Sequence, residues 1–228
     1  MPRRLREMID FNQPRFMQIS ESHCGPAVIE MLLSNLGIEV SQEQVADAGG
    51  ATSLIELRGM RVDQLALAVH KLAPGLLFYV KEQATVEELV RAVHDYHYPV
   101  GVEWQGVFED EDAALYDRAN KNWSPAVTND LKEMIQDSES QDTDYGHYSL
   151  VIRADRRRRE LIIADPYKDY FSQARIFDFE LFDRRWYDFN EMPVPGSDET
   201  ETVKDDHLMF VVVRRNITFP RRLGMQAI

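Results

Sequence analysis

The chain has 228 residues, 44% of them hydrophobic and 29% charged, a composition that predicts a single globular domain with one substantial core. Its formal net charge of −13 argues against nonspecific nucleic-acid binding, because a phosphate backbone repels an acidic surface. Its apolar runs fall short of the roughly 18 residues that a membrane span requires, and its N-terminal segment lacks the apolar stretch of a secretory signal. We therefore expect neither nucleic acid nor a membrane as a partner.

The first half of the sequence predicts mostly helices, because its apolar residues recur at helical spacing. Pro26 suits the first turn of the helix that follows Cys24, and Gly37 ends that helix. Ser41 and Gln44 have the spacing of a capping box and open a second helix. The predicted helices cover approximately residues 25–36, 41–49, 62–72 and 85–96.

β-Branched and aromatic runs bounded by turn residues predict strands, which are concentrated in the second half of the chain. The predicted strands cover residues 76–80, 99–104, 148–152, 161–164 and 208–213. This order of elements predicts an α+β fold in which helices pack on an antiparallel sheet.

Two polar segments interrupt the predicted single domain of residues 1–228. Residues 106–144 form an acidic insertion with two weak helical patches, and the alternatives for a loop of this length are a functional lid and a disordered excursion. Residues 195–206 are polar and predict a flexible connection.

Cys24 is the only cysteine of the chain, so no intramolecular disulfide is possible and we expect a reducing, cytoplasmic location. The predicted helix begins at this residue. A helix N-terminus presents unpaired backbone N–H groups and a partial positive charge, which favour a thiolate over a thiol. Because the thiolate is the reactive form, Cys24 is a candidate nucleophile. The sequence carries no signature of a particular oligomeric state.

A cysteine nucleophile needs a histidine as its base, and the histidine needs a third group that orients it. His147 opens one predicted strand, and Asp165 follows the strand after it. With the turn between these strands centred on Arg156, His147 faces Asp165 directly, at the roughly 4.5–5.5 Å between Cβ atoms that allows a hydrogen bond. A slip of one residue would place them on opposite faces of the sheet.

Other side chains have weaker claims to a role. The side-chain amide of Gln18 and the backbone N–H of Cys24 are candidates for an oxyanion hole. Glu103 and Trp104, at the end of the preceding strand, are candidates for substrate contact, although core packing is the alternative for Trp104. We predict no metal site, because no carboxylate or cysteine joins His94 and His97 at a ligand spacing.

The pattern of Gln18, five intervening residues and Cys24-Gly25-Pro26-Ala27, followed by His147-Tyr148 and Ala164-Asp165-Pro166, resembles the papain-like cysteine peptidases that process double-glycine leaders of bacteriocins, peptidase family 39. Residues 179–186, a short segment ending in tryptophan, add to the likeness. The resemblance implies a papain-like fold and a peptide or protein substrate. It also implies the oxyanion donor, nucleophile, base and orienting acid as roles of Gln18, Cys24, His147 and Asp165.

The predicted function is a thiol hydrolase that cleaves a peptide or isopeptide bond through an acyl-enzyme on Cys24, with no cofactor. Two alternatives remain open. An amine acceptor in place of water would make the protein an acyltransferase that uses the same residues. A non-catalytic peptide-binding module would retain the fold without the chemistry.

Overall fold

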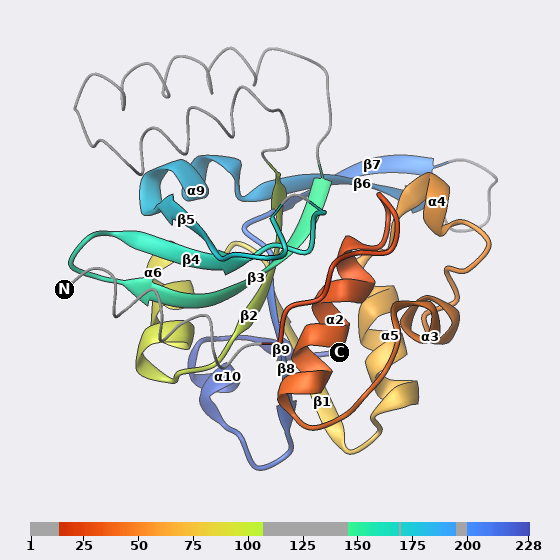
Figure 1. The fold of residues 1–228 in the computed structure, drawn as a ribbon, viewed down its shortest axis with the longest axis horizontal. Coiled ribbons are helices and arrows are strands. Elements are labelled where there is room, and N and C mark those ends of the chain that lie inside the picture. Colours follow the sequence, from red (N-terminus) through yellow and green to blue (C-terminus); the bar gives the residue numbers. More distant parts are fainter. Residues whose placement is uncertain (1–13, 107–145, 169, 195–199) are drawn as a thin grey trace.

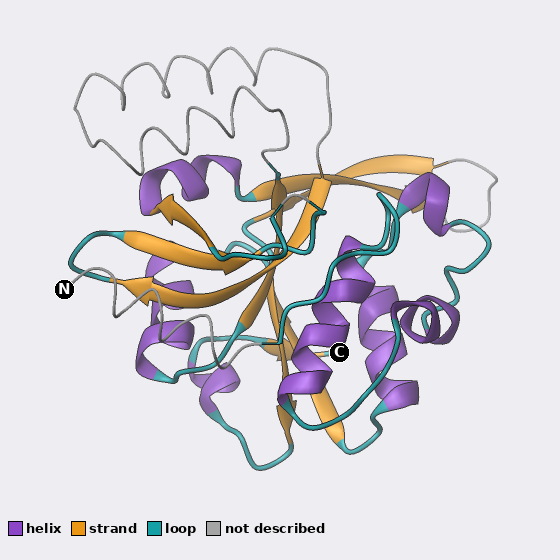
Figure 2. Cartoon of the chain, in the orientation of Figure 1, coloured by secondary structure: helices purple, strands orange, loops and turns teal. Residues whose placement is uncertain are grey.

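The computed structural model describes residues 14–106, 146–168, 170–194 and 200–228, and its helices cover both faces of a central sheet (Figures 1 and 2). The predicted insertion at 106–144 lies outside these residues except for Gly106. No helix within the described ranges combines the length and apolar character needed to cross a bilayer.

The four helices predicted for the first half are present, the last of them continued by a π-helical turn, and a short helix at Ile55–Arg58 is an addition that the sequence analysis did not predict. The capping box at Ser41 is confirmed, since Gln44 N donates to Ser41 Oγ and Ser41 N donates to Gln44 Oε1. A second capping box joins Thr85 and Glu88. The helices are α2 (Cys24–Asn35), α3 (Gln42–Ala48), α4 (Ile55–Arg58), α5 (Val62–Leu72) and α6 (Val86–Val90), with a π-helical turn η1 at Arg91–Asp95.

Seven strands of the described chain form one sheet in the order β5-β4-β3-β2-β8-β1-β9, and neighbouring strands pair antiparallel. The predicted α+β class is therefore confirmed. The strands are β1 (Leu76–Lys81), β2 (Val100–Gln105), β3 (Gly146–Asp155), β4 (Glu160–Ala164), β5 (Arg175–Asp178), β8 (Met209–Arg214) and β9 (Gln226–Ala227).

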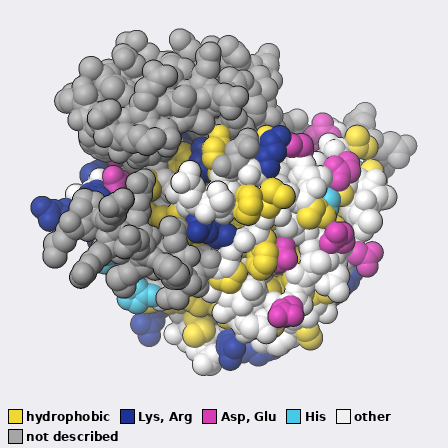
Figure 3. All heavy atoms as spheres, viewed as in Figure 1, with side chains coloured by type: hydrophobic (Ala, Val, Ile, Leu, Met, Phe, Trp, Pro, Cys, Tyr) yellow, Lys and Arg dark blue, Asp and Glu magenta, His cyan; other side chains and the backbone are white. Residues whose placement is uncertain are grey.

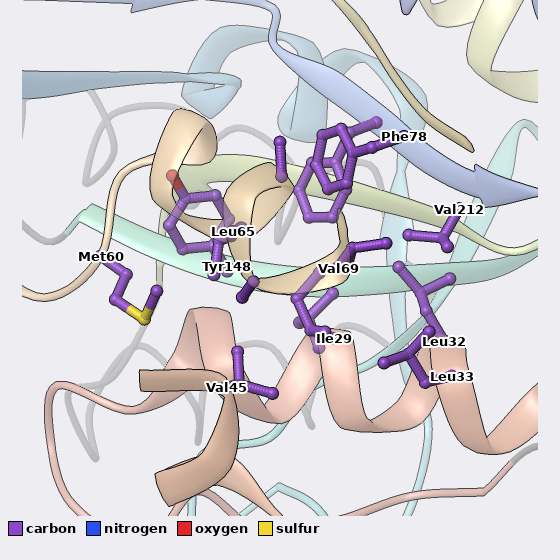
Figure 4. Packing of buried hydrophobic residues seen from close by; sticks show 14 of the residues in the cluster. Ile29, Leu32, Leu33, Val45, Met60, Leu65, Val69, Phe78, Tyr148 and Val212 are labelled. Carbon is purple, nitrogen blue, oxygen red and sulfur yellow. The ribbon is translucent and has the colours of Figure 1, made fainter. Parts of the chain in front are cut away.

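Both faces of the sheet are buried, and β8 shows why. Phe210 and Val212 point to the side of α2, α3 and α5, whereas Met209, Val211 and Val213 pack with residues of α6, α9 (Phe179–Arg185) and α10 (Phe219–Arg222). Because side chains alternate between the two faces, a strand covered on both sides is apolar throughout. Figure 4 shows the first of these two cores, with side chains from α2 and α5 against the sheet.

The predicted flexible connection at residues 195–206 is wrong for its second part. Residues 200–206 are not a flexible connection but strand β7 (Thr200–Asp206), paired with β6 (Tyr187–Pro193) in a separate two-stranded sheet, while 195–199 lie outside the described residues. Most of β7 is exposed, so its sequence has no apolar alternation to signal a strand.

The register of the β3–β4 hairpin also differs from the prediction. Val151 pairs with Ile163 rather than with Leu161, because the four-residue turn lies further along the chain and a bulge interrupts the ladder after Val151. The displacement is two residues at this end of the hairpin. Since side chains alternate with a period of two, His147 and Asp165 remain on the same face but lie diagonally instead of directly opposite.

Gly101 of β2 leaves room for the Phe210 ring that stacks on Phe78 at a centroid distance of 5.2 Å. A Cβ atom at position 101 would lie 2.2 Å from that ring. We expect Gly101→Ala to lower the free energy of unfolding by about 1–3 kcal/mol, measured by urea denaturation, because an overpacked core strains its neighbours. Gly75→Ala is the matched control, since its Cβ atom would meet no heavy atom within 4 Å. Equal unfolding midpoints for the two variants would contradict this packing argument.

Candidate active site

Cys24 is the first residue of α2 and is buried, with 9% of its surface exposed. Pro26 and Ala27 follow in the first turn, where the backbone N–H of Ala27 donates to the carbonyl of His23 at 3.0 Å. The N–H of Cys24 belongs to the first four of the helix, which have no partner within the helix itself. The sulfur therefore lies where backbone donors and the positive end of the helix dipole meet.

His147 is brought to this sulfur by β3. Its Nε2 donates to Asp165 Oδ1 at 2.8 Å, and both side chains are buried. Cys24 also acts on this imidazole, since its hydrogen bonding and charge both raise the pKa of His147. Because Nε2 meets Asp165, Nδ1 is the ring nitrogen left to face the sulfur. The structure thus joins the three residues that the sequence singled out as nucleophile, base and orienting acid.

Asp165 follows the end of β4, and each of its carboxylate oxygens has a defined donor. Oδ1 accepts from Tyr167 N at 3.0 Å as well as from His147, and Oδ2 accepts from Arg175 Nη1 at 2.6 Å. The sequence analysis missed Arg175. Arg175 and the buried Phe177 are two residues apart on β5 and therefore share one face of the strand. A charged residue on an otherwise apolar face was the available signal.

Gln18 is buried beside the same segment. Its backbone N–H donates to the carbonyl of Pro166 at 2.8 Å, which ties the N-terminal chain to the residue after Asp165. Its side-chain Nε2 donates to the carbonyl of Ser20 at 2.8 Å. An amide nitrogen carries two hydrogens, so this contact orients the group and leaves one hydrogen for another acceptor.

The turn between Gln18 and Cys24 is held by a second group of polar contacts. Ser20 Oγ lies 2.7 Å from His23 Nδ1 and donates to the Glu56 carboxylate at 2.9 Å. Ser22 Oγ donates to the carbonyl of Glu56. His23 is therefore engaged with Ser20, and these contacts connect the turn to α4.

Glu103 and Trp104, the two expected substrate contacts, both lie in the interior. Trp104 is fully buried, donates from Nε1 to Ser149 Oγ at 3.1 Å and packs edge-on against Phe177. Glu103 is 1% exposed and accepts from Asn190 Nδ2 at 3.1 Å. This geometry favours core packing for Trp104, the alternative noted above, and within the described chain it places Glu103 in the interior beside Asn190.

The charges of the site are coupled. Burial alone would lower the pKa of His147, but the charge and hydrogen bond of Asp165, together with Cys24, outweigh it and raise the pKa to about 9. Burial would raise the pKa of Asp165, but His147, Arg175 and the backbone N–H of Tyr167 hold it well below its ordinary value. His147 is therefore an imidazolium and Asp165 a carboxylate at neutral pH.

Some titratable side chains outside these three residues have surroundings of their own. Burial raises the pKa of Glu103 to about 7. His207 faces Asp183 at 3.2 Å, and His94 pairs with Asp95 at 2.9 Å. Within the described ranges, no three His, Cys, Asp or Glu side chains come together as metal ligands would.

Comparison with known proteins places this geometry in context. The model of a family described as "Peptidase_C39 like family" matches residues 11–193. No curated protein sequence matches the chain.

Two solved structures resemble it in fold, each at 15% sequence identity. The peptidase domain of Streptococcus ComA, a bifunctional ABC transporter in a quorum sensing pathway, superposes with a TM-score of 0.54 over 90% of this chain and 99% of that one. A double-glycine-motif protease from an AMS/PCAT transporter, in complex with its leader peptide, has a TM-score of 0.50 over 89% and 91% of the two chains. The fold is therefore that of these peptidase domains.

The contact between His147 and Cys24 predicts the reactivity of the thiol. We expect iodoacetamide to alkylate Cys24 readily near pH 6. His147→Ala should slow the reaction about tenfold or more, because alanine has no positive charge to favour the thiolate. The rate is measured by mass spectrometry against pH. His94→Ala, which removes an exposed histidine, is the control and should leave the rate unchanged. A wild-type profile that follows an ordinary thiol, titrating near about 8.5, would count against an activated nucleophile.

Proposed function

Because this chain belongs to the Peptidase_C39-like family, we propose that it is a cysteine peptidase with Cys24 as nucleophile, His147 as general base and acid, Asp165 as orienting acid and Gln18 as oxyanion donor. The observation that carries the proposal is the buried hydrogen bond between His147 and Asp165, together with Cys24 at the N-terminus of α2, whose side chain acts on the same imidazole. A nucleophile, a base and an orienting group in this relation perform acyl transfer in unrelated proteins.

In the first half of the proposed reaction the Cys24 thiolate attacks the carbonyl carbon of the scissile bond. The negative charge that develops on the carbonyl oxygen is stabilised by the free amide hydrogen of Gln18 and the backbone N–H of Cys24. His147 then gives its Nδ1 proton to the departing amine, and the acyl group stays on sulfur as a thioester.

In the second half His147 is neutral and its Nδ1 takes a proton from water, which attacks the thioester. The tetrahedral intermediate collapses, releases the acid product and returns Cys24 as a thiolate beside the imidazolium. Asp165 keeps the Nε2 hydrogen engaged throughout, which leaves Nδ1 as the nitrogen that exchanges protons with substrate and water.

The proposed substrate is a peptide or protein with an apolar segment near the scissile bond. Met17 and Ile19 flank Gln18 and are about half exposed, as is Leu54, and Leu57 of α4 is 81% exposed. The contacts of Ser20 and Ser22 with Glu56 place α4 against this turn. Hydrophobic side chains gather in the middle of the face shown in Figure 3, beside acidic side chains over the helical part. Such a surface suits apolar side chains of a peptide.

A peptide-library cleavage screen tests the proposal, with products identified by mass spectrometry. We expect cleavage by the wild type and none by Cys24→Ala. Gln18→Ala should lower kcat roughly 10²–10³-fold with a smaller change in KM, because an oxyanion donor acts in the transition state. Product carrying an added amine in place of water would favour the acyltransferase. Peptides that bind without being cleaved, together with an unreactive Cys24, would favour the binding module.

The raised pKa of His147 predicts the alkaline limb of the activity profile. The proposed mechanism needs an imidazolium to protonate the leaving amine, so kcat/KM should fall as pH rises through about 9. Asp165→Asn removes the charge that favours the imidazolium and should move this limb toward lower pH. Steady-state kinetics across pH 5–10 measure the alkaline limb of the wild type and of Asp165→Asn. An alkaline limb that stays in place in Asp165→Asn would contradict the assigned role of the carboxylate.

A further inference from the structure

Arg175 is the one charged side chain outside the proposed triad that contacts Asp165 in the described chain. It is the first residue of β5 and is 8% exposed. Its Nη1 donates to Asp165 Oδ2 at 2.6 Å, while Oδ1 of the same carboxylate faces His147 Nε2 at 2.8 Å. The two cations therefore divide the two oxygens between them.

The guanidinium of Arg175 is itself fixed in place. Its central carbon lies 3.8 Å from the centroid of the Tyr170 ring and 4.8 Å from that of Phe177. In the β4–β5 ladder Arg175 pairs with Ile163, two residues before Asp165. A planar guanidinium held against aromatic rings presents its N–H groups in one direction, which an ammonium group on a flexible stem does not.

We propose that Arg175 is a positioning residue that acts through Asp165 and keeps this carboxylate ionised and correctly rotated during the reaction. The inference rests on the proposed function. A carboxylate can turn about its Cβ–Cγ bond, and anchoring Oδ2 fixes the direction of Oδ1. The buried ion pair therefore determines which oxygen the imidazole meets.

The charge of Arg175 matters most at the stage when His147 is neutral. After His147 has given its proton to the leaving amine, Asp165 remains a buried carboxylate without an imidazolium, and burial would favour its protonation. A protonated Asp165 would donate to Nε2, which would place the imidazole hydrogen on Nδ1 and prevent it from accepting a proton from water. The guanidinium does not titrate, so it stabilises the ionised carboxylate in both halves of the cycle.

The pH dependence of Cys24 alkylation tests this inference without a substrate. We expect Arg175→Gln to slow alkylation near pH 6 about tenfold and to move the acid limb of the profile upward by about one pH unit, because the site loses a cation and a correctly oriented carboxylate. Arg175→Lys retains the charge without the planar geometry and should recover only part of the shift. Tyr170→Phe retains the ring and should match the wild type.

A double-mutant comparison separates positioning from a direct effect of charge on the sulfur. Asp165→Asn should shift the limb by itself, and adding Arg175→Gln to it should produce no further shift if Arg175 acts through Asp165. An additional shift of full size would overturn the inference.

Arg185→Gln is the control for loss of a buried arginine. Arg185 is 7% exposed and donates to the carbonyl oxygens of Gln105 and Gly106. Circular dichroism and thermal unfolding establish that each variant folds. If Arg175→Gln is unfolded, Tyr170→Ala takes its place and should give a smaller shift in the same direction. The inference would be overturned if Arg185→Gln moved the acid limb as far as Arg175→Gln does. It would also be overturned if a folded Arg175→Gln or Tyr170→Ala variant left the acid limb unchanged.

The wild-type profile separates this inference from the proposed function. A wild-type Cys24 that behaves as an ordinary thiol would refute the activated nucleophile and with it the proposed peptidase mechanism. A reactive wild-type Cys24 that is insensitive to Arg175 would refute only the positioning role.

Discussion

A hydrogen bond between a buried imidazole and a buried carboxylate is the interaction on which the site depends. Moving either charge alone out of water is unfavourable, and in the interior each of the two compensates the other. His147 and Asp165 meet at 2.8 Å with almost no exposed surface, so their attraction is weakly screened. The pair holds an imidazolium next to Cys24, which is what the proposed chemistry requires.

Three distant segments must converge for this pair to serve a thiol. The N-terminus of α2 supplies the sulfur, the start of β3 supplies the imidazole and the residue after β4 supplies the carboxylate. The backbone contact between Gln18 and Pro166 fastens the oxyanion donor to the carboxylate segment. The sheet, buried on both faces, gives these elements a rigid base.

The sequence predicted the elements well where the signal was local. Capping boxes, the helix start at Cys24 and the continuous apolar run of β8 each depend on residues close together in the chain. The pairing of His147 with Asp165 was reached from a register that proved to be displaced by two residues. It survived because an even displacement keeps both side chains on one face.

Features that depend on distant contacts were not predictable from the sequence. Arg175 lies ten residues after Asp165, and only the tertiary fold shows that its guanidinium meets the carboxylate. Strand β7 has mostly exposed side chains, so its pairing with β6 left no periodic signal. Core packing was noted as the alternative for Trp104, but its partners, aromatic rings from β5 and α9, appear only in the tertiary fold.

The protonation of His147 is the most direct test of the central claim. An NMR titration of its imidazole, assigned by comparison with His147→Ala, reports that equilibrium in the wild-type protein without a substrate. The account predicts a pKa of about 9, well above the ordinary value of 6.5. A pKa at or below 6.5 would show that burial outweighs the carboxylate, and it would contradict the charged pair on which the proposed mechanism is built.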